Sequence, residues 1–139
     1  MVSPNNPGPG HTYDDIIKVA VHELVHIAAE VLSPDTTDNR PYLSEGLATY
    51  LAGQYKISDI AGSIRQLRQS GNADIPCVDT IIGPEWGDYV YDMGFVFMHF
   101  IVSGFGHDGL AALYRDPDAF VLAHEGLNEM WMRFLGDNF

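Results

Sequence analysis

The chain has 139 residues, which is the usual size of one globular domain and enough to bury a hydrophobic core without disulfides. Its 19 acidic residues outnumber the 7 lysines and arginines, so the formal net charge is −12. Because such a charge repels phosphate groups, it disfavours binding to nucleic acid or to anionic membrane surfaces. The single cysteine, Cys77, excludes an internal disulfide. We therefore expect one domain spanning residues 1–139.

No targeting signal is expected in residues 1–11. Residues 1–11 contain three prolines and two glycines and predict an irregular lead-in. They lack the basic start and apolar core of a signal peptide, and no apolar run elsewhere predicts a membrane-spanning segment. A secreted or membrane-anchored parent protein is compatible with this sequence, so the compartment stays open, as does the oligomeric state.

The first predicted helix runs from Tyr13 to about Leu32. Thr12 and Asp15 stand three residues apart and resemble a capping box at its start, and Ser33-Pro34 ends it. Apolar residues recur at steps of three and four, which predicts one buried face. That face consists of Ile16, Val19, Ala20, Leu24, Ile27 and Val31.

The pattern of apolar residues also predicts helices in the rest of the chain. They are expected over 43–54, 58–69, 89–102, 107–114 and 125–135. Glycines and prolines predict loops over 33–41 and 71–87, and the second loop is expected to contain one short helical turn. Gly104 and Gly106 are expected to end the helix over 89–102, and Asp116-Pro117 to end the helix over 107–114. Only 2–3 and 77–82 carry weak strand signals. The fold class is therefore mainly α, with little or no β-sheet.

The sequence His22-Glu23-Leu24-Val25-His26 is an H-E-x-x-H motif within the first predicted helix. Residues four apart share one face of a helix, so both imidazoles can bind a single zinc ion. Glu23 follows the first histidine directly, which places its carboxylate near the metal as a base for an attacking water. The alternative is a chance motif with two solvated histidines. The apolar neighbours argue against it, because buried polar groups need partners.

A catalytic zinc site needs a third protein ligand beside a water molecule. Glu45 is the best candidate, because it follows His26 after 18 intervening residues and opens the second predicted helix. If that helix runs antiparallel to the first, Glu45 returns to the face that carries the histidines. Gly46 would leave room for these two helices to approach closely. The alternative is a glutamate that merely favours the positive end of a helix.

These motifs resemble a known family. The features that carry the resemblance are HELVH, the 18-residue gap and the segment LSEGLATYLAG. They are similar to the motifs of the gluzincin metallopeptidases, which include thermolysin-like enzymes and a group of aminopeptidases. The resemblance is greatest to bacterial peptidase MA-like domains. The likeness is strong over 12–55 and weaker over 89–115. It implies a zincin-like catalytic subdomain in which the two motif helices pack together with C-terminal helices. It also implies Zn²⁺ held by His22, His26 and Glu45, and hydrolysis of a peptide or protein substrate with Glu23 as general base.

The family usually supplies a further Tyr or His that hydrogen-bonds the developing oxyanion. The segment Tyr91-Asp92-Met93-Gly94 is similar to the Tyr-Glu-Lys-Gly segment of the gluzincin aminopeptidases. The resemblance therefore implies this role for Tyr91. Tyr89 is the rival, and a packing aromatic on a buried helix is the remaining alternative.

Three features depart from the family pattern. Thr49 stands where thermolysin-like enzymes carry an Asp that orients a metal-binding His, so the partners of the histidines are uncertain. The Gly-x-Met-Glu-Asn motif of the aminopeptidases is absent. Only 21 residues precede His22, too few for the family's upstream β-sheet. We expect a trimmed domain, a minimal version of the fold, or one that a partner completes.

The remaining reactive side chains are expected to be structural or solvated rather than ligands. This applies to His11, His99, His107 and His124. Cys77 is expected to be a small buried residue, and Trp86, Trp131 and the aromatic residues of 95–105 are expected in the core.

Peptide-bond hydrolysis is the leading functional hypothesis, although whether it is endo- or exopeptidase action is open. A zinc-bound but catalytically silent or autoinhibited module, structural or peptide-binding, is the second hypothesis, motivated by Thr49 and by the lack of an upstream sheet. A helical interaction bundle with a chance motif is the third.

Overall fold

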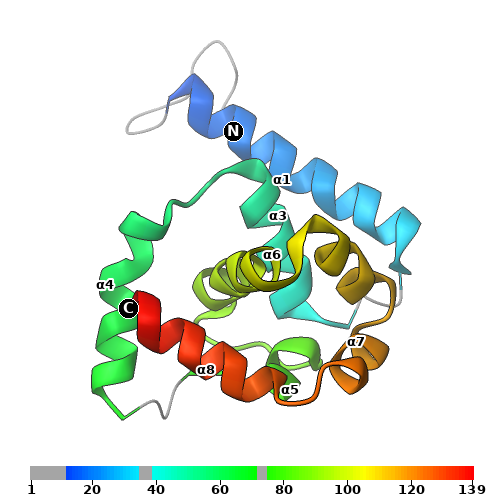
Figure 1. Cartoon of the computed structure of the whole chain (residues 1–139). Coiled ribbons are helices and arrows are strands. Elements are labelled where there is room, and N and C mark those ends of the chain that lie inside the picture. The colour runs from blue at the N-terminus through cyan, green and yellow to red at the C-terminus, as the bar shows by residue number, and fades with distance from the viewer. Residues whose placement is uncertain (1–11, 35–38, 72–74) are drawn as a thin grey trace.

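A computed structural model describes residues 12–34, 39–71 and 75–139, and within these ranges the chain forms helices and no strand. The helices are α1 (Tyr13–Leu32), α3 (Pro41–Ala52), α4 (Ile57–Gln69), α5 (Val78–Ile82), α6 (Val90–Arg115), α7 (Pro117–Ala123) and α8 (Leu127–Asn138) (Figure 1). The prediction of a mainly α fold is confirmed. The predicted lead-in over 1–11, with its weak strand signal and His11, lies outside the described residues.

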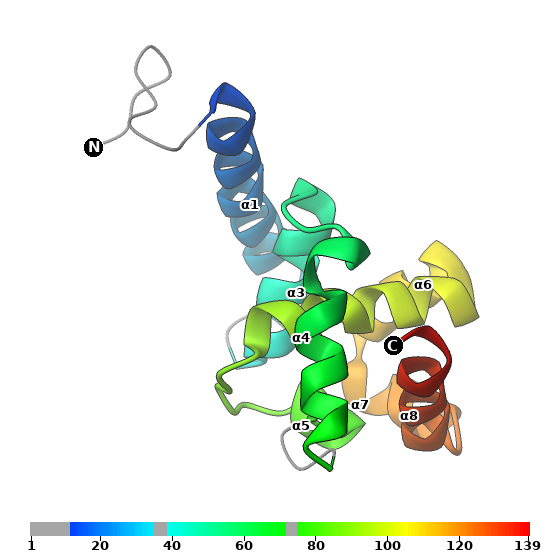
Figure 2. The ribbon, with the colours of Figure 1, turned by 90° about the vertical axis from the view of Figure 1, so that its left-hand side faces the viewer.

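Helix α6 occupies the middle of the molecule, and the other helices surround it (Figure 1). Helix α3 packs against α6 on one side and against α1 on the other, so α1 forms an outer layer. After a quarter turn, α1 extends away from the body formed by α4, α6, α7 and α8 (Figure 2). Helices α1 and α3, which carry the two motifs, therefore meet at the edge of the molecule.

The hydrophobic core forms around α6. Its largest fully buried side chains include Trp131, Phe97, Leu43, Ile64 and Met93. Two buried donors connect distant segments: the Trp131 indole Nε1 donates to the Pro76 carbonyl at 3.0 Å, and the Tyr114 hydroxyl donates to the Leu43 carbonyl. The expected core position of Trp131 is confirmed, as it is for Phe97.

The expected burial of Trp86 and of Cys77 is wrong. Trp86 is 65 % exposed, and Cys77 is also exposed. Both residues lie outside the helices, Trp86 between α5 and α6 and Cys77 just before α5. Residue type predicts burial only on average. Segments that connect helices run over the surface, so a tryptophan or cysteine in such a segment can be exposed.

Local signals fixed the start of α1. The Thr12 backbone N–H donates to Asp15 Oδ2 at 2.9 Å and the Asp15 N–H donates to Thr12 Oγ1 at 3.2 Å, which confirms the capping box. Helix α3 begins two residues before its predicted start, with Pro41 in its first turn. It ends at Ala52 and is followed by Gly53, whose φ of 65° is left-handed.

The short helical turn predicted within 71–87 is present as α5 (Val78–Ile82), so the weak strand signal over 77–82 is wrong. The Val78 N–H donates to Asn128 Oδ1 at 3.0 Å. The later helices differ from prediction in two further places. Helix α6 continues through Gly104 and is interrupted only at Gly106, with φ 70° and ψ −175°. No helix was predicted over Pro117–Ala123, where α7 forms. Its start is set by the Ala119 N–H, which donates to Asp116 Oδ1 at 3.0 Å, followed by a proline in the first turn.

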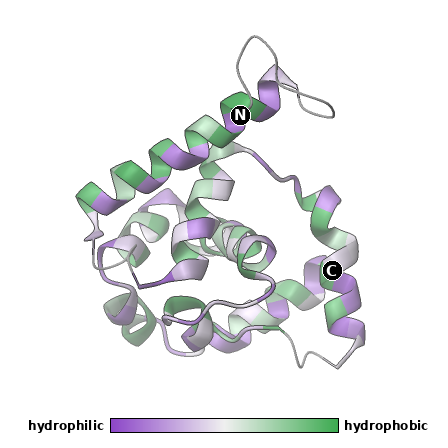
Figure 3. Cartoon of the chain, turned by 180° about the vertical axis from the view of Figure 1, so that it is seen from behind, coloured by the Kyte–Doolittle hydropathy of each residue, from purple (hydrophilic) through white to green (hydrophobic). Residues whose placement is uncertain are grey.

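The face of α1 that was predicted to be buried is instead solvent-exposed. Val19, Leu24, Ile27 and Val31 are each more than half exposed, and hydrophobic positions colour the outer side of α1 (Figure 3). The side that packs on α3 carries His22, which is only 8 % exposed. Helix α1 has apolar residues on more than one side, so periodicity identified a stripe but could not decide which stripe α3 would cover.

Helices α3 and α6 cross with their backbones in contact. A Cβ added to Gly46 would lie 2.6 Å from the Gly94 backbone, and one added to Gly94 would lie 2.5 Å from the Tyr42 carbonyl oxygen. Gly46 was predicted to permit close approach to the histidine-bearing helix, and this is wrong, because the close partner is α6. The crossing fixes the position of Gly46 in α3, and with it the position of the preceding residue, Glu45.

Helix α6 is the one helix in the described ranges whose length and composition would allow it to cross a membrane. It is interrupted at Gly106, and side chains such as Met93, Phe97 and Ile101 are fully buried by the surrounding helices. The core helix of a globular domain has the same properties, and we interpret α6 in that way.

Candidate metal centre

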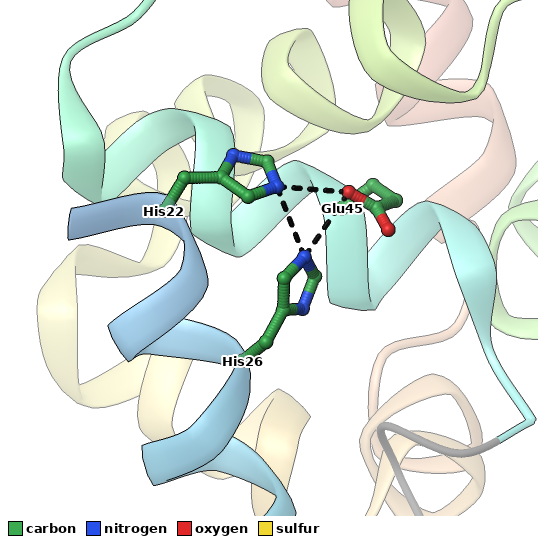
Figure 4. A group of neighbouring side chains, drawn as sticks. All are labelled: His22, His26 and Glu45. Atoms are coloured by element: carbon green, nitrogen blue, oxygen red, sulfur yellow. Dashed lines mark hydrogen bonds and ion pairs between the residues drawn. The ribbon is translucent and has the colours of Figure 1, made fainter. Parts of the chain in front are cut away.

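Three side chains predicted as metal ligands converge at the contact between α1 and α3. His22 Nε2 lies 3.0 Å from His26 Nε2 and 3.1 Å from Glu45 Oε2, and His26 Nε2 lies 3.2 Å from the same carboxylate oxygen (Figure 4). The three atoms form an almost equilateral triangle. In the part of the chain that the structure describes, this is the one group of three or more His, Cys, Asp or Glu side chains close enough to share a metal ion.

The local structure explains why these side chains meet. His22 and His26 are four residues apart in α1 and face the same side, toward α3. His26, the later of the two histidines in α1, contacts Ser44 near the start of α3. His22, the earlier one, contacts Gln54 just beyond the end of α3. The two helices are therefore antiparallel, as predicted, and Glu45, the fifth residue of α3, reaches both imidazoles.

Hydrogen bonds to the other ring nitrogens orient both histidines. His22 Nδ1 donates to Gln54 Oε1 at 2.6 Å, which leaves the Nε2 lone pair directed at the centre of the triangle. His26 Nδ1 lies 3.2 Å from Ser44 Oγ. Thr49, the residue at the family's Asp position, has a buried hydroxyl with no hydrogen-bond partner in the described structure. Gln54 was not predicted as a partner of the histidines. It orients His22 from a position five residues after Thr49.

The donor set fits a zinc ion. Tetrahedral zinc with bonds of about 2.0–2.2 Å holds its ligand atoms about 3.3–3.5 Å apart, close to the 3.0–3.2 Å between the three atoms here. Two imidazoles and one carboxylate are ligand types that zinc accepts, and three protein ligands leave a fourth position for water or substrate. With both Nε2 atoms unprotonated, their lone pairs and the carboxylate oxygen would repel one another, and a shared cation would relieve that repulsion.

Glu23 and Tyr91, the two predicted catalytic side chains, both lie beside this triangle. Glu23 is exposed and lines two cavities that flank the ligands, and Tyr91 lines one of them together with His22. Partial burial, and then the negative charges of Glu45 and Glu23, raise the pKa of the Tyr91 phenol above its usual value. The phenol therefore keeps its proton at neutral pH and can donate a hydrogen bond. The rival, Tyr89, precedes α6 and does not line either cavity.

The other histidines have different surroundings. His99 contacts the rings of Tyr50 and Phe95, and burial lowers the pKa of its imidazole. His124 Nδ1 donates to the Phe120 carbonyl at 2.7 Å, and His107 is exposed. None of these three belongs to a group of candidate ligands in the described ranges.

Three comparisons were made with known proteins. No family model, no curated protein and no solved structure matches this chain. The features of this chain that bear on function are its own side chains: a triangle of two imidazoles and one carboxylate at the contact of two antiparallel helices, with Glu23 exposed beside it.

Proposed function

We propose that this protein is a zinc-dependent peptidase in which His22, His26 and Glu45 hold the metal. The observation that carries the proposal is the triangle of ligand atoms, with sides of 3.0–3.2 Å, beside the exposed Glu23 carboxylate. A structural zinc site usually has four protein ligands and is closed to solvent, whereas three ligands and an adjoining cavity are typical of a catalytic site.

The chemistry divides between the metal and the protein. Zinc bound at this site would lower the pKa of water and polarise a substrate carbonyl group. Glu23 accepts a proton from the attacking water and passes it to the leaving amine, and its exposed position beside both cavities suits this shuttle. Gln54 holds His22 in the tautomer that presents Nε2 to the metal.

The first test is metal dependence. We expect the purified protein to bind one zinc ion per chain and to hydrolyse an unstructured protein such as casein, with loss of activity on chelation and recovery on adding zinc. His22→Ala should lose both zinc and activity, because two remaining ligands hold zinc poorly. His107→Ala, a change at an exposed histidine outside the site, is the matched control. Stoichiometric zinc in His22→Ala, measured by elemental analysis, would contradict the proposed ligands.

Tyr91 is proposed to donate a hydrogen bond to the oxyanion that forms during attack. Tyr91→Phe should lower kcat by about 10²–10³-fold with little change in zinc affinity, which is the usual cost of one oxyanion donor. Tyr89→Phe, two residues earlier and outside both cavities, should retain activity. Steady-state kinetics of the two variants decide between the tyrosines, and the opposite ranking would transfer the role to Tyr89.

One observation favours a second candidate, a zinc-binding module without turnover. The described residues contain no strand on which an extended substrate could pair along its backbone. Under this alternative, the wild-type protein binds zinc at full stoichiometry but leaves casein intact at every enzyme concentration tested.

A further inference from the structure

Two cavities lie against the candidate metal centre, and Glu23 lines both. The larger, of about 440 Å³, is also lined by His26, Asn39, Pro41, Ser44, Glu45, Pro84 and Trp86. The smaller, of about 260 Å³, is also lined by Val19, His22, Gln54, Tyr55 and Tyr91. The ligand atoms are thus divided between them, with His26 and Glu45 on one side and His22 on the other.

The direction of the helices places the two cavities on opposite sides of the site. The larger cavity is formed by His26 of α1 and the first turn of α3, while the smaller is formed by Val19 of α1 and Gln54 just beyond the end of α3. Because α1 and α3 are antiparallel, these are the two ends of one helix contact. A ligand that occupied both cavities would extend past Glu23 and lie beside all three ligand side chains, because His26 and Glu45 line one cavity and His22 lines the other.

From this arrangement we infer that the site accepts an internal stretch of an extended polypeptide and cuts within it, as an endopeptidase; the inference rests on the proposed peptidase function. An exopeptidase must hold a charged chain terminus next to the bond that is cut. Here the carboxylates among the described lining residues are Glu23 and Glu45, which already serve as proton shuttle and ligand, and the basic side chains are the two metal-binding histidines. The bound chain can continue on both sides.

The linings also indicate which side chains would be accepted. Pro41, Pro84 and Trp86 contribute apolar surface to the larger cavity, and Val19 and Tyr55 contribute it to the smaller. Trp86 is 65 % exposed, so its ring is available to a ligand. Aromatic side chains provide large contact areas at low entropic cost. The substrate class is therefore a polypeptide segment with apolar or aromatic residues next to the cleaved bond.

The contribution of Trp86 can be measured apart from the chemistry. Trp86→Ala should lower kcat/KM by about tenfold for a peptide with an apolar residue beside the cut bond, mainly through KM, and Trp86→Phe should restore most of it. Leu122→Ala, at another exposed apolar side chain outside both cavities, is the control. Equal kcat/KM for wild type and Trp86→Ala would overturn the assignment of this cavity to substrate.

The decisive experiment uses one peptide with a central aromatic–apolar pair in four forms: both ends free, N-terminus acetylated, C-terminus amidated, or both ends blocked. The zinc-loaded full chain should cut all four at comparable rates at an internal bond, as seen by mass spectrometry. Cleavage that requires a free terminus, or that releases one residue at a time, would overturn the inference and leave the peptidase proposal intact. If zinc is bound but all four forms and casein stay uncut, the proposed function itself fails, and this inference fails with it.

Discussion

Glu23→Gln is expected to lower kcat/KM by about 10²–10⁴-fold, the usual contribution of a positioned general base. The amide keeps nearly the same shape as the carboxylate but cannot accept the proton of the attacking water. Glu23 is exposed and lies outside the ligand triangle, so folding and zinc content should not change. Steady-state hydrolysis and elemental zinc analysis on the same preparation measure both quantities.

The control for this variant is Glu30→Gln, which makes the same chemical change at another exposed position of α1. It should have wild-type activity, because Glu30 lines neither cavity. Wild-type turnover in Glu23→Gln would refute the role of general base. Loss of zinc from Glu23→Gln would instead make this carboxylate a ligand, which the triangle of His22, His26 and Glu45 does not predict.

Gly94→Ala should cause a large loss of stability. The added methyl carbon would lie 2.5 Å from the Tyr42 carbonyl oxygen and 3.0 Å from the Gly46 Cα, so the backbones of α3 and α6 must separate. Overpacking of this kind costs about 1–3 kcal/mol, a large share of the 5–15 kcal/mol that is typical of a whole domain. Because Glu45 precedes Gly46 in α3, zinc affinity should fall as well. Urea unfolding and zinc titration measure the two effects.

Gly104→Ala is the matched control in the same helix. No atom lies within 4 Å of a Cβ added there, and its backbone is helical. Alanine restricts the unfolded chain more than glycine does, so this variant should be more stable than wild type by up to about 1 kcal/mol. If the two alanine variants had the same stability, the backbone contact between α3 and α6 would not be important for the fold.

The sequence determined the features of this protein that depend on neighbouring residues in the chain. The capping box of Thr12 and Asp15, the extent of α1 and the common face of His22 and His26 follow from the helical repeat and from hydrogen bonds within one turn. The convergence of Glu45 on this face was also predicted, because a short connection between two helices favours an antiparallel return. Helix α7 was missed although Asp116 and Pro117 carry its start signal.

Only the tertiary structure decided which surfaces meet. It placed the apolar side of α1 around Leu24 in solvent, paired Gly46 with Gly94 instead of with α1, and brought Gln54 rather than residue 49 to His22. It also left Trp86 exposed beside the candidate site. Periodicity shows that a helix has an apolar stripe, but the stripe that is buried depends on a partner far away in sequence, because packing depends on the shapes of both surfaces at once.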